Sequence, residues 1–151
     1  MRSVIQRVTR AEVAISGETV GVIDKGVLAL VAFESADGEK EMTYMLEKII
    51  GLRIFEDDGG KMNLSVNDIG GGLLIVPNFT LYGDARHGKR PGYSTGAPPD
   101  IARGMFEQFT TMAKMMFPPE KLGFGVFQAD MQVSLVNDGP VTLMIDSAKV
   151  F

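Results

Sequence analysis

Cysteine is absent from the 151-residue sequence, and histidine occurs only once. The missing thiols exclude disulfides, thiolate zinc sites and a cysteine nucleophile, and they are compatible with a reducing compartment. Long apolar runs are missing too, since none approaches the roughly 20 residues that span a bilayer. The charged start Met1–Arg7 also lacks the apolar centre of a signal peptide. We therefore expect a cytoplasmic protein with no membrane partner.

The side chains of familiar hydrolase sites are scarce as well. His87 lies in a glycine-flanked basic loop, a poor place to hold an imidazole in one tautomer, so we do not expect a Ser-His-Asp triad. Zinc ligands do not cluster and no glycine-rich phosphate-binding motif occurs, so we expect neither a metal nor a cofactor. An enzyme with this sequence has to work through backbone groups, positioning or groups of its substrate.

Positive charge is in deficit, with 15 basic against 19 acidic residues and a net charge of -4. This balance argues against non-specific coating of a nucleic acid, and we expect no DNA partner. Four basic side chains nevertheless gather at 86–90, inside a glycine- and proline-rich stretch, 83–99, that predicts a long ordered loop. The cluster is more typical of a solvated loop, and a loop that contacts phosphate is the alternative.

Residues 1–151 are expected to form a single domain, because the length and a hydrophobic content of 45% fit one core without repeats or linkers. Runs of strand-forming residues are separated by turn residues. They predict a strand at Val4–Val8 that Glu12–Ile15 continues, and further strands at Thr19–Ile23, Val27–Phe33, Leu52–Phe55, Leu73–Val76, Phe124–Phe127, Met131–Val136 and Val141–Asp146.

Two helices are predicted between these strands. The first follows an Asp37 N-cap and runs to about Ile50, with apolar residues every three or four positions. The second is opened by Pro98-Pro99 and ended by Pro118-Pro119, and its methionine-rich stripe is typical of a core-facing surface. The order of elements favours a mixed α/β fold in which the helices pack on a curved sheet.

The first candidate motif, Pro77-Asn78-Phe79-Thr80-Leu81, directly follows the predicted strand Leu73–Val76. A chain that leaves a buried strand presents successive backbone N–H groups, which can form an oxyanion hole. Thr80 adds a hydroxyl. A strand with a proline kink explains the same residues without any chemistry, so the motif alone leaves both interpretations open.

The second motif is Asn137-Asp138-Gly139-Pro140-Val141-Thr142, which predicts a hairpin between the last two strands. Asn, Asp and Gly are ordinary turn residues. Proline directly after glycine is less routine because it removes a donor from the incoming strand. About 5–6% of bonds before proline are cis in folded proteins, so both isomers stay open for Gly139-Pro140.

Together these motifs resemble those of the D-aminoacyl-tRNA deacylases. That family carries Ser-Gln-Phe-Thr-Leu and Asn-x-Gly-Pro-Val-Thr at this separation, an arginine at the place of Arg7, and an Ala-x-Met step matched by Ala129-Asp130-Met131. The similarity extends from Met1 to Asp146. It implies a barrel-like sheet with two packed helices, a homodimer, and hydrolysis of the ester that joins a D-amino acid to the 3′ end of tRNA.

The resemblance also implies a chiral filter. Gly139 and Pro140 of one subunit, joined by a cis bond, would enter the active site of the other and leave no room for an L side chain. Arg7 would help to hold this segment inward. Glycyl-tRNA, including glycine mischarged on the alanine tRNA, has no side chain and would pass the same filter.

The catalytic roles implied by the resemblance fall on the first motif. The backbone at Phe79 and Thr80, with Asn78 beside it, would bind and polarise the ester carbonyl, and Met131 would line the pocket. The 2′-hydroxyl of the terminal adenosine would assist the attacking water, which suits the missing acid and base side chains.

The sequence departs from the family pattern in three places. Pro77 and Asn78 replace Ser-Gln, and Gln128 stands where a glycine is usual. A related group that edits L-alanine mischarged on tRNA also has the proline, but it has alanine in place of Phe79 and an aromatic residue in place of Val141. We therefore favour the D-specific type. L-alanyl editing and a catalytically silent module that binds RNA ends are the alternatives.

Overall fold

The computed structural model describes residues 1–151, and its chain opens with three antiparallel strands. They are β1 (Arg2–Ile15), β2 (Glu18–Ile23) and β3 (Gly26–Ala32). Glu12–Ile15 was predicted to continue the strand Val4–Val8, and β1 is one continuous strand that contains both segments. Its first half pairs with β3 and its second half with β2, so one long strand serves both neighbours.

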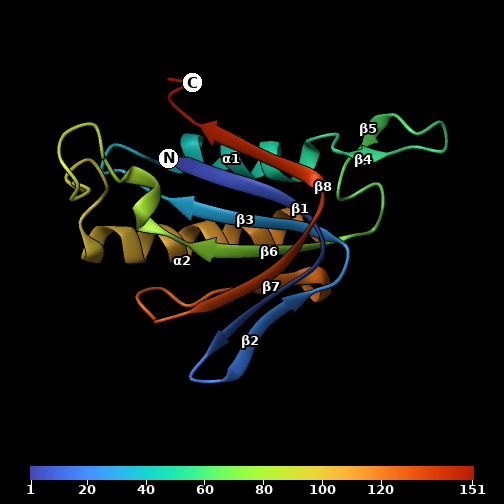
Figure 1. The fold of residues 1–151 in the computed structure, drawn as a ribbon, viewed down its shortest axis with the longest axis horizontal. Helices are drawn as coiled ribbons and strands as arrows, with labels where there is room; N and C mark the ends of the chain where they lie inside the picture. Colours follow the sequence, from blue (N-terminus) through green and yellow to red (C-terminus); the bar gives the residue numbers. More distant parts are fainter.

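The sheet continues in parallel beyond β3. Strand β6 (Gly72–Pro77) pairs with β3, and β7 (Leu122–Phe124) pairs with β6, which gives the order β2-β1-β3-β6-β7 (Figure 1). The two ends of this path curl together: a Cβ built on Gly21 of β2 would lie 3.0 Å from the Phe124 carbonyl oxygen. The result is a nearly closed, barrel-like sheet, as the resemblance implied.

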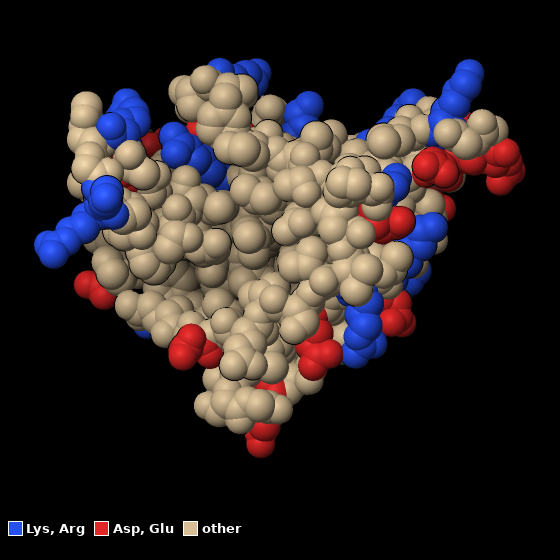
Figure 2. Space-filling view, viewed as in Figure 1, with Lys and Arg blue, Asp and Glu red and all other residues tan.

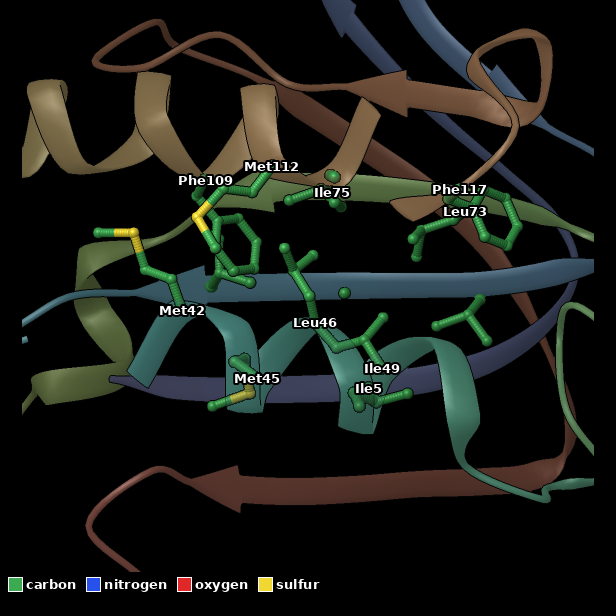
Figure 3. Close-up of a cluster of buried hydrophobic side chains, with 14 of the residues drawn as sticks. Ile5, Met42, Met45, Leu46, Ile49, Leu73, Ile75, Phe109, Met112 and Phe117 are labelled. Atoms are coloured by element: carbon green, nitrogen blue, oxygen red, sulfur yellow. The ribbon is translucent and has the colours of Figure 1, made fainter. Parts of the chain in front are cut away.

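Both predicted helices are present and cover one face of the sheet (Figure 1). Helix α1 spans Glu39–Gly51 and α2 spans Pro99–Met116. Their apolar stripes meet the strands in the main core, where Leu46 and Ile49 of α1 face Phe109 of α2 (Figure 3). Amphipathic spacing therefore predicted the buried centre of both stripes, whereas Ile101 and Met116, at the two ends of the α2 stripe, are 48% and 39% exposed.

The predicted helix start was wrong by one residue. Gly38 is the N-cap of α1, and the Glu41 carboxylate accepts its N–H at 3.0 Å. Asp37 is buried, and its carboxylate accepts the Glu34 N–H at 2.8 Å. The Asp37 side chain thus closes the preceding turn instead of the helix.

Two short strands were placed imprecisely. The strand predicted at Leu52–Phe55 begins only at Phe55, as the two-residue strand β4 (Phe55–Glu56). Across the expected turn, β4 pairs with a strand that was not predicted, β5 (Met62–Leu64). The strand predicted at Phe124–Phe127 ends at Phe124, because the chain then turns with a hydrogen bond from the Ala129 N–H to the Val126 oxygen at 3.2 Å.

The predicted terminal hairpin is wrong. Residues Gln132–Asp146 form one strand, β8, which runs antiparallel to β1 throughout. A hairpin would reverse the chain, whereas both halves of β8 pair with the same strand in the same direction. Between them, Asp138–Val141 bulges outward opposite Arg7 alone, and we call this segment the β8 bulge. None of the helices is long and apolar enough to cross a membrane.

Candidate active site

The first motif forms a short helical turn at the end of β6. Asn78 leaves the sheet with its N–H bonded to the Val31 oxygen at 2.7 Å, and it caps the 3-10 helix Phe79–Tyr82. The Asn78 Oδ1 accepts the Thr80 N–H at 3.2 Å and the Thr80 hydroxyl at 2.6 Å. The amide thus does the work of an N-cap, for which asparagine is well suited.

An aromatic pair extends this turn. The exposed Phe79 ring meets the Tyr93 ring edge to face, with centroids 5.1 Å apart. Tyr93 follows a bridge in which Asp84 and Gly92 exchange hydrogen bonds of 2.7 and 2.9 Å. The sequence analysis missed Tyr93, and its one signal was an aromatic residue inside a glycine- and proline-rich loop.

A cavity of about 1050 Å³ opens beside this turn. Asn78, Phe79 and Tyr93 form one wall, and Met131, Val133 and Leu135 at the start of β8 form another. Figure 2 shows the corresponding hollow, where most of the visible surface belongs to residues other than Lys, Arg, Asp and Glu. Asp130 is the one carboxylate that lines it, and no Lys, Arg or His does. The cavity therefore offers apolar surface and amide groups but no general base of ordinary pKa near 7.

A loop between β7 and β8 forms a further part of the cavity wall. The Met131 thioether accepts the Val126 N–H at 3.3 Å, and the Gln128 side chain accepts a hydrogen bond from Arg103 of α2. Gln128 has a φ of 61°, a left-handed conformation that favours glycine. The usual glycine of the family pattern fits this backbone, and here a hydrogen bond to α2 accompanies the glutamine.

Arg7 lies outside this cavity, next to the β8 bulge. Its side chain is 8% exposed. Its Nε donates to the Asp138 carbonyl oxygen at 2.8 Å and its Nη1 to the Ile54 oxygen at 2.6 Å. Its guanidinium also lies 3.5 Å from the Asp138 carboxylate. Arg7 thus ties the bulge to β1 and to the segment before β4.

The bulge itself is exposed but firmly held. Gly139 has a φ of +145°, and a Cβ there would lie 2.7 Å from the Val141 nitrogen, so only glycine fits. The Gly139-Pro140 bond is cis. Asn137 closes the base of the bulge: its Oδ1 accepts the Val141 N–H at 2.8 Å, and its Nδ2 donates to the Gln6 Oε1 at 3.0 Å.

The candidate residues consequently fall into two groups within one chain. Asn78, Phe79 and Met131 share the cavity, and Thr80 stands beside it. The second group, Arg7 with Gly139 and Pro140, surrounds the bulge and lines none of that cavity. Gln6 connects the groups, since it lines the cavity and accepts the hydrogen bond from Asn137. No three metal-ligating side chains gather anywhere in the chain.

Comparison with known proteins extends over nearly the whole chain. A family model described as D-Tyr-tRNA(Tyr) deacylase matches residues 4–146. The D-aminoacyl-tRNA deacylase of Thermosipho africanus is 56% identical over 151 residues, with 100% of both chains covered. The protein of the same description from Desulfitobacterium hafniense is 55% identical over 151 residues, again with 100% of both covered.

Solved structures share the fold. One described as the c-Myc DNA unwinding element binding protein superposes with a TM-score of 0.92 at 37% identity, covering 97% of this chain and 98% of that one. A probable eukaryotic D-amino acid tRNA deacylase gives a TM-score of 0.80 over 95% of this chain and 97% of that one; its 16% identity supports likeness of fold alone.

The fold and these relatives define the class of protein as a hydrolase that acts on aminoacyl-tRNA. The chain belongs to the D-Tyr-tRNA(Tyr) deacylase family.

Proposed function

We propose that the protein hydrolyses the ester bond of D-aminoacyl-tRNA and releases the D-amino acid and free tRNA in the cytoplasm. The observation that carries the proposal is the largely apolar cavity beside Asn78 and Phe79 in a chain of this family. Its apolar walls suit the terminal adenosine and an amino-acid side chain, and the helical turn at Phe79 lies at its edge.

Backbone polarisation of the ester carbonyl is the chemistry that this site supports. The Phe79 N–H begins a helical turn, and the first N–H groups of a helix have no acceptor within it. The Thr80 N–H is already bonded to Asn78. We therefore assign the larger share of oxyanion stabilisation to Phe79 and a positioning role to Asn78 and Thr80. With no suitable base in the cavity, the 2′-hydroxyl of the terminal adenosine would assist the attacking water.

Chirality would be read by a second subunit. The bulge is exposed, braced by Arg7 and Asn137, and absent from the cavity of its own chain. A rigid, exposed segment of this kind suits insertion into the cavity of a partner. There the partner subunit's Gly139 and the partner subunit's Pro140 would occupy the space of an L side chain. Glycyl-tRNA, including glycine mischarged on the alanine tRNA, would be cleaved as well.

The surface of β8 supports a homodimer. This strand pairs with β1 on one edge and with no strand on the other. It also exposes Val136 and Met144, 58% and 64% accessible in the single chain. An open strand edge with exposed apolar side chains is a natural place for a second copy to pair.

The direct test offers D- and L-tyrosyl-tRNA to the purified protein and measures release of the amino acid. We expect rapid cleavage of the D form and little of the L form. Equal rates, or no cleavage of the D form, would contradict the proposal. Binding of tRNA without any cleavage would identify a silent module that binds RNA ends.

L-alanyl editing is the second candidate, and Pro77 at the end of β6 favours it. Phe79 and Val141 favour the D-specific type. Comparison of L-alanyl-tRNA with D-alanyl-tRNA separates the two, because only an L-alanyl editor cleaves the L form faster.

A further inference from the structure

A closed turn of basic residues stands beside the cavity. Asp84 and Gly92 are bonded to each other twice, so the segment between them, which we call the basic loop (Asp84–Gly92), has a fixed root. The next residue, Tyr93, packs on Phe79 and lines the cavity. Figure 2 shows Lys and Arg side chains gathered on the side of the hollow where Figure 1 places this loop. The loop is therefore anchored to the mouth of the cavity.

The positive charges of the basic loop are not equivalent. The Arg86 guanidinium donates hydrogen bonds of 2.9 and 2.6 Å to the Asp84 carboxylate. These bonds lower the pKa of Asp84 to about 2. This pair is internal and organises the loop. Lys89 and Arg90 are exposed, and neither forms an ion pair or a hydrogen bond. Two cations thus remain available to an anion from outside.

Lys89 and Arg90 are exposed positive charges in a chain of net negative charge, beside a cavity that no cation lines. The whole chain carries a net charge of -4, and the cavity itself is lined by one carboxylate and no cation. A general attraction for polyanions is therefore not expected. A nucleic acid whose last nucleotide lies in the cavity must leave through its mouth, and each further nucleotide adds a phosphate there.

We propose that Lys89 and Arg90 bind backbone phosphates of the tRNA acceptor end while its terminal nucleotide occupies the cavity. This inference rests on the proposed function and adds a phosphate-binding site to it. Contacts of this kind position the nucleic acid without reading its sequence. They act on the strand outside the cavity, so they raise affinity for the whole tRNA and leave the ester-cleaving step unchanged.

The test compares two substrates of the double variant Lys89→Gln/Arg90→Gln. One is D-tyrosyl-tRNA, and the other is D-tyrosyl-adenosine, which has the same ester and no phosphate. For the tRNA substrate we expect KM to rise about tenfold with kcat unchanged, and the slope of log affinity against log salt to fall by roughly 1.5. For the adenosine substrate we expect no change.

The matched control is Lys25→Gln/Lys61→Gln, which removes two exposed cations that line no part of the cavity. It should leave both substrates unaffected. An unchanged KM for the tRNA in the loop variant, or an equal rise in the control, would overturn the inference. If the wild-type protein cleaves neither substrate, the proposed function has failed, while fluorescence anisotropy with uncharged tRNA still decides whether the basic loop binds it.

Discussion

Asn137 shows how one side chain can hold the β8 bulge in shape. Its amide nitrogen donates to the Gln6 Oε1 at 3.0 Å and to the Val141 oxygen at 3.1 Å, and its amide oxygen accepts the Val141 N–H at 2.8 Å. An aspartate has the same shape and no donors. The hydrogen bonds to the Gln6 Oε1 and the Val141 oxygen would be replaced by contacts between oxygen atoms, and the contact of the amide nitrogen with the Thr142 hydroxyl at 3.1 Å would also lose its donor.

We predict that Asn137→Asp lowers the free energy of unfolding by about 2–3 kcal/mol, the combined effect of lost hydrogen bonds and acceptors left unpaired. Urea denaturation measures it. Asn67→Asp is the control, because the Asn67 side chain is exposed and only its backbone oxygen accepts a hydrogen bond, from the Gly70 N–H at 3.0 Å. That variant should change stability by less than about 0.5 kcal/mol. Similar losses in the two variants would show that the donors of Asn137 are unimportant.

A single substitution at Thr80 tests whether its hydroxyl acts as the nucleophile. The hydroxyl donates to the Asn78 Oδ1 at 2.6 Å, which is a structural hydrogen bond rather than the geometry of a base-activated nucleophile. We predict that Thr80→Ala keeps substantial activity in single-turnover hydrolysis of D-tyrosyl-tRNA. Complete loss of turnover in a protein that stays folded would indicate a covalent threonine mechanism instead.

At the scale of elements, the parallel pair β3–β6 depends on two glycines. A Cβ on Gly26 would lie 2.0 Å from the Gly72 carbonyl oxygen, so the strands cannot approach with any larger residue. We predict that Gly26→Ala lowers the free energy of unfolding by about 3 kcal/mol or more, because the strands must separate.

An alanine at Gly104 is expected to stabilise the protein, in contrast to one at Gly26. Gly104 is exposed within α2, and a Cβ there meets no atom within 4 Å. Gly104→Ala should raise the free energy of unfolding by about 1 kcal/mol through helix propensity. Thermal or urea unfolding of the two alanine variants checks the pair, and equal effects would contradict the role of the close approach.

Elements whose pattern is local were predicted well from the sequence. Both helices follow from apolar residues at helical spacing, and their buried faces are the expected ones. The error at β8 has a physical cause. Asn-Asp-Gly is a turn signal whether the chain reverses or only bulges, and the choice depends on long-range pairing of both halves with β1.

The same limit applies to the candidate site. The resemblance to a known family pointed to Asn78, Phe79 and Met131, which the fold brings to one cavity. Tyr93 and Gln6 were missed, because their places depend on the path of a long loop and on which face of β1 turns inward. The roles assigned to Gly139 and Pro140 stay predictions.

At the scale of the whole molecule, complementation tests whether the two groups of residues meet across subunits. Met131→Arg would place a charge in the cavity, and Gly139→Ala would distort the bulge, because a Cβ there lies 2.7 Å from the Val141 nitrogen. We predict that each variant alone is inactive. Mixed dimers hold one intact site, so random reassortment should restore about a quarter of wild-type activity.

The control mixes Gly139→Ala with Arg7→Met. Both changes affect the bulge, so no intact site can form in the mixed dimer, and no recovery is expected. Recovery in this control, or none in the first mixture after subunit exchange, would contradict a shared site. Subunit exchange is followed by mass spectrometry of the mixed species.

The closure of the sheet between Gly21 and Phe124 sets a limit on how far this protein can assemble. A sheet with two open edges can add copies at each end and grow into a filament. Here β2 and β7 cover each other, so β8 is the one long edge left open. Pairing through a single edge consumes it in the first encounter. Growth by strand addition at the β8 edge would therefore stop at a pair of copies.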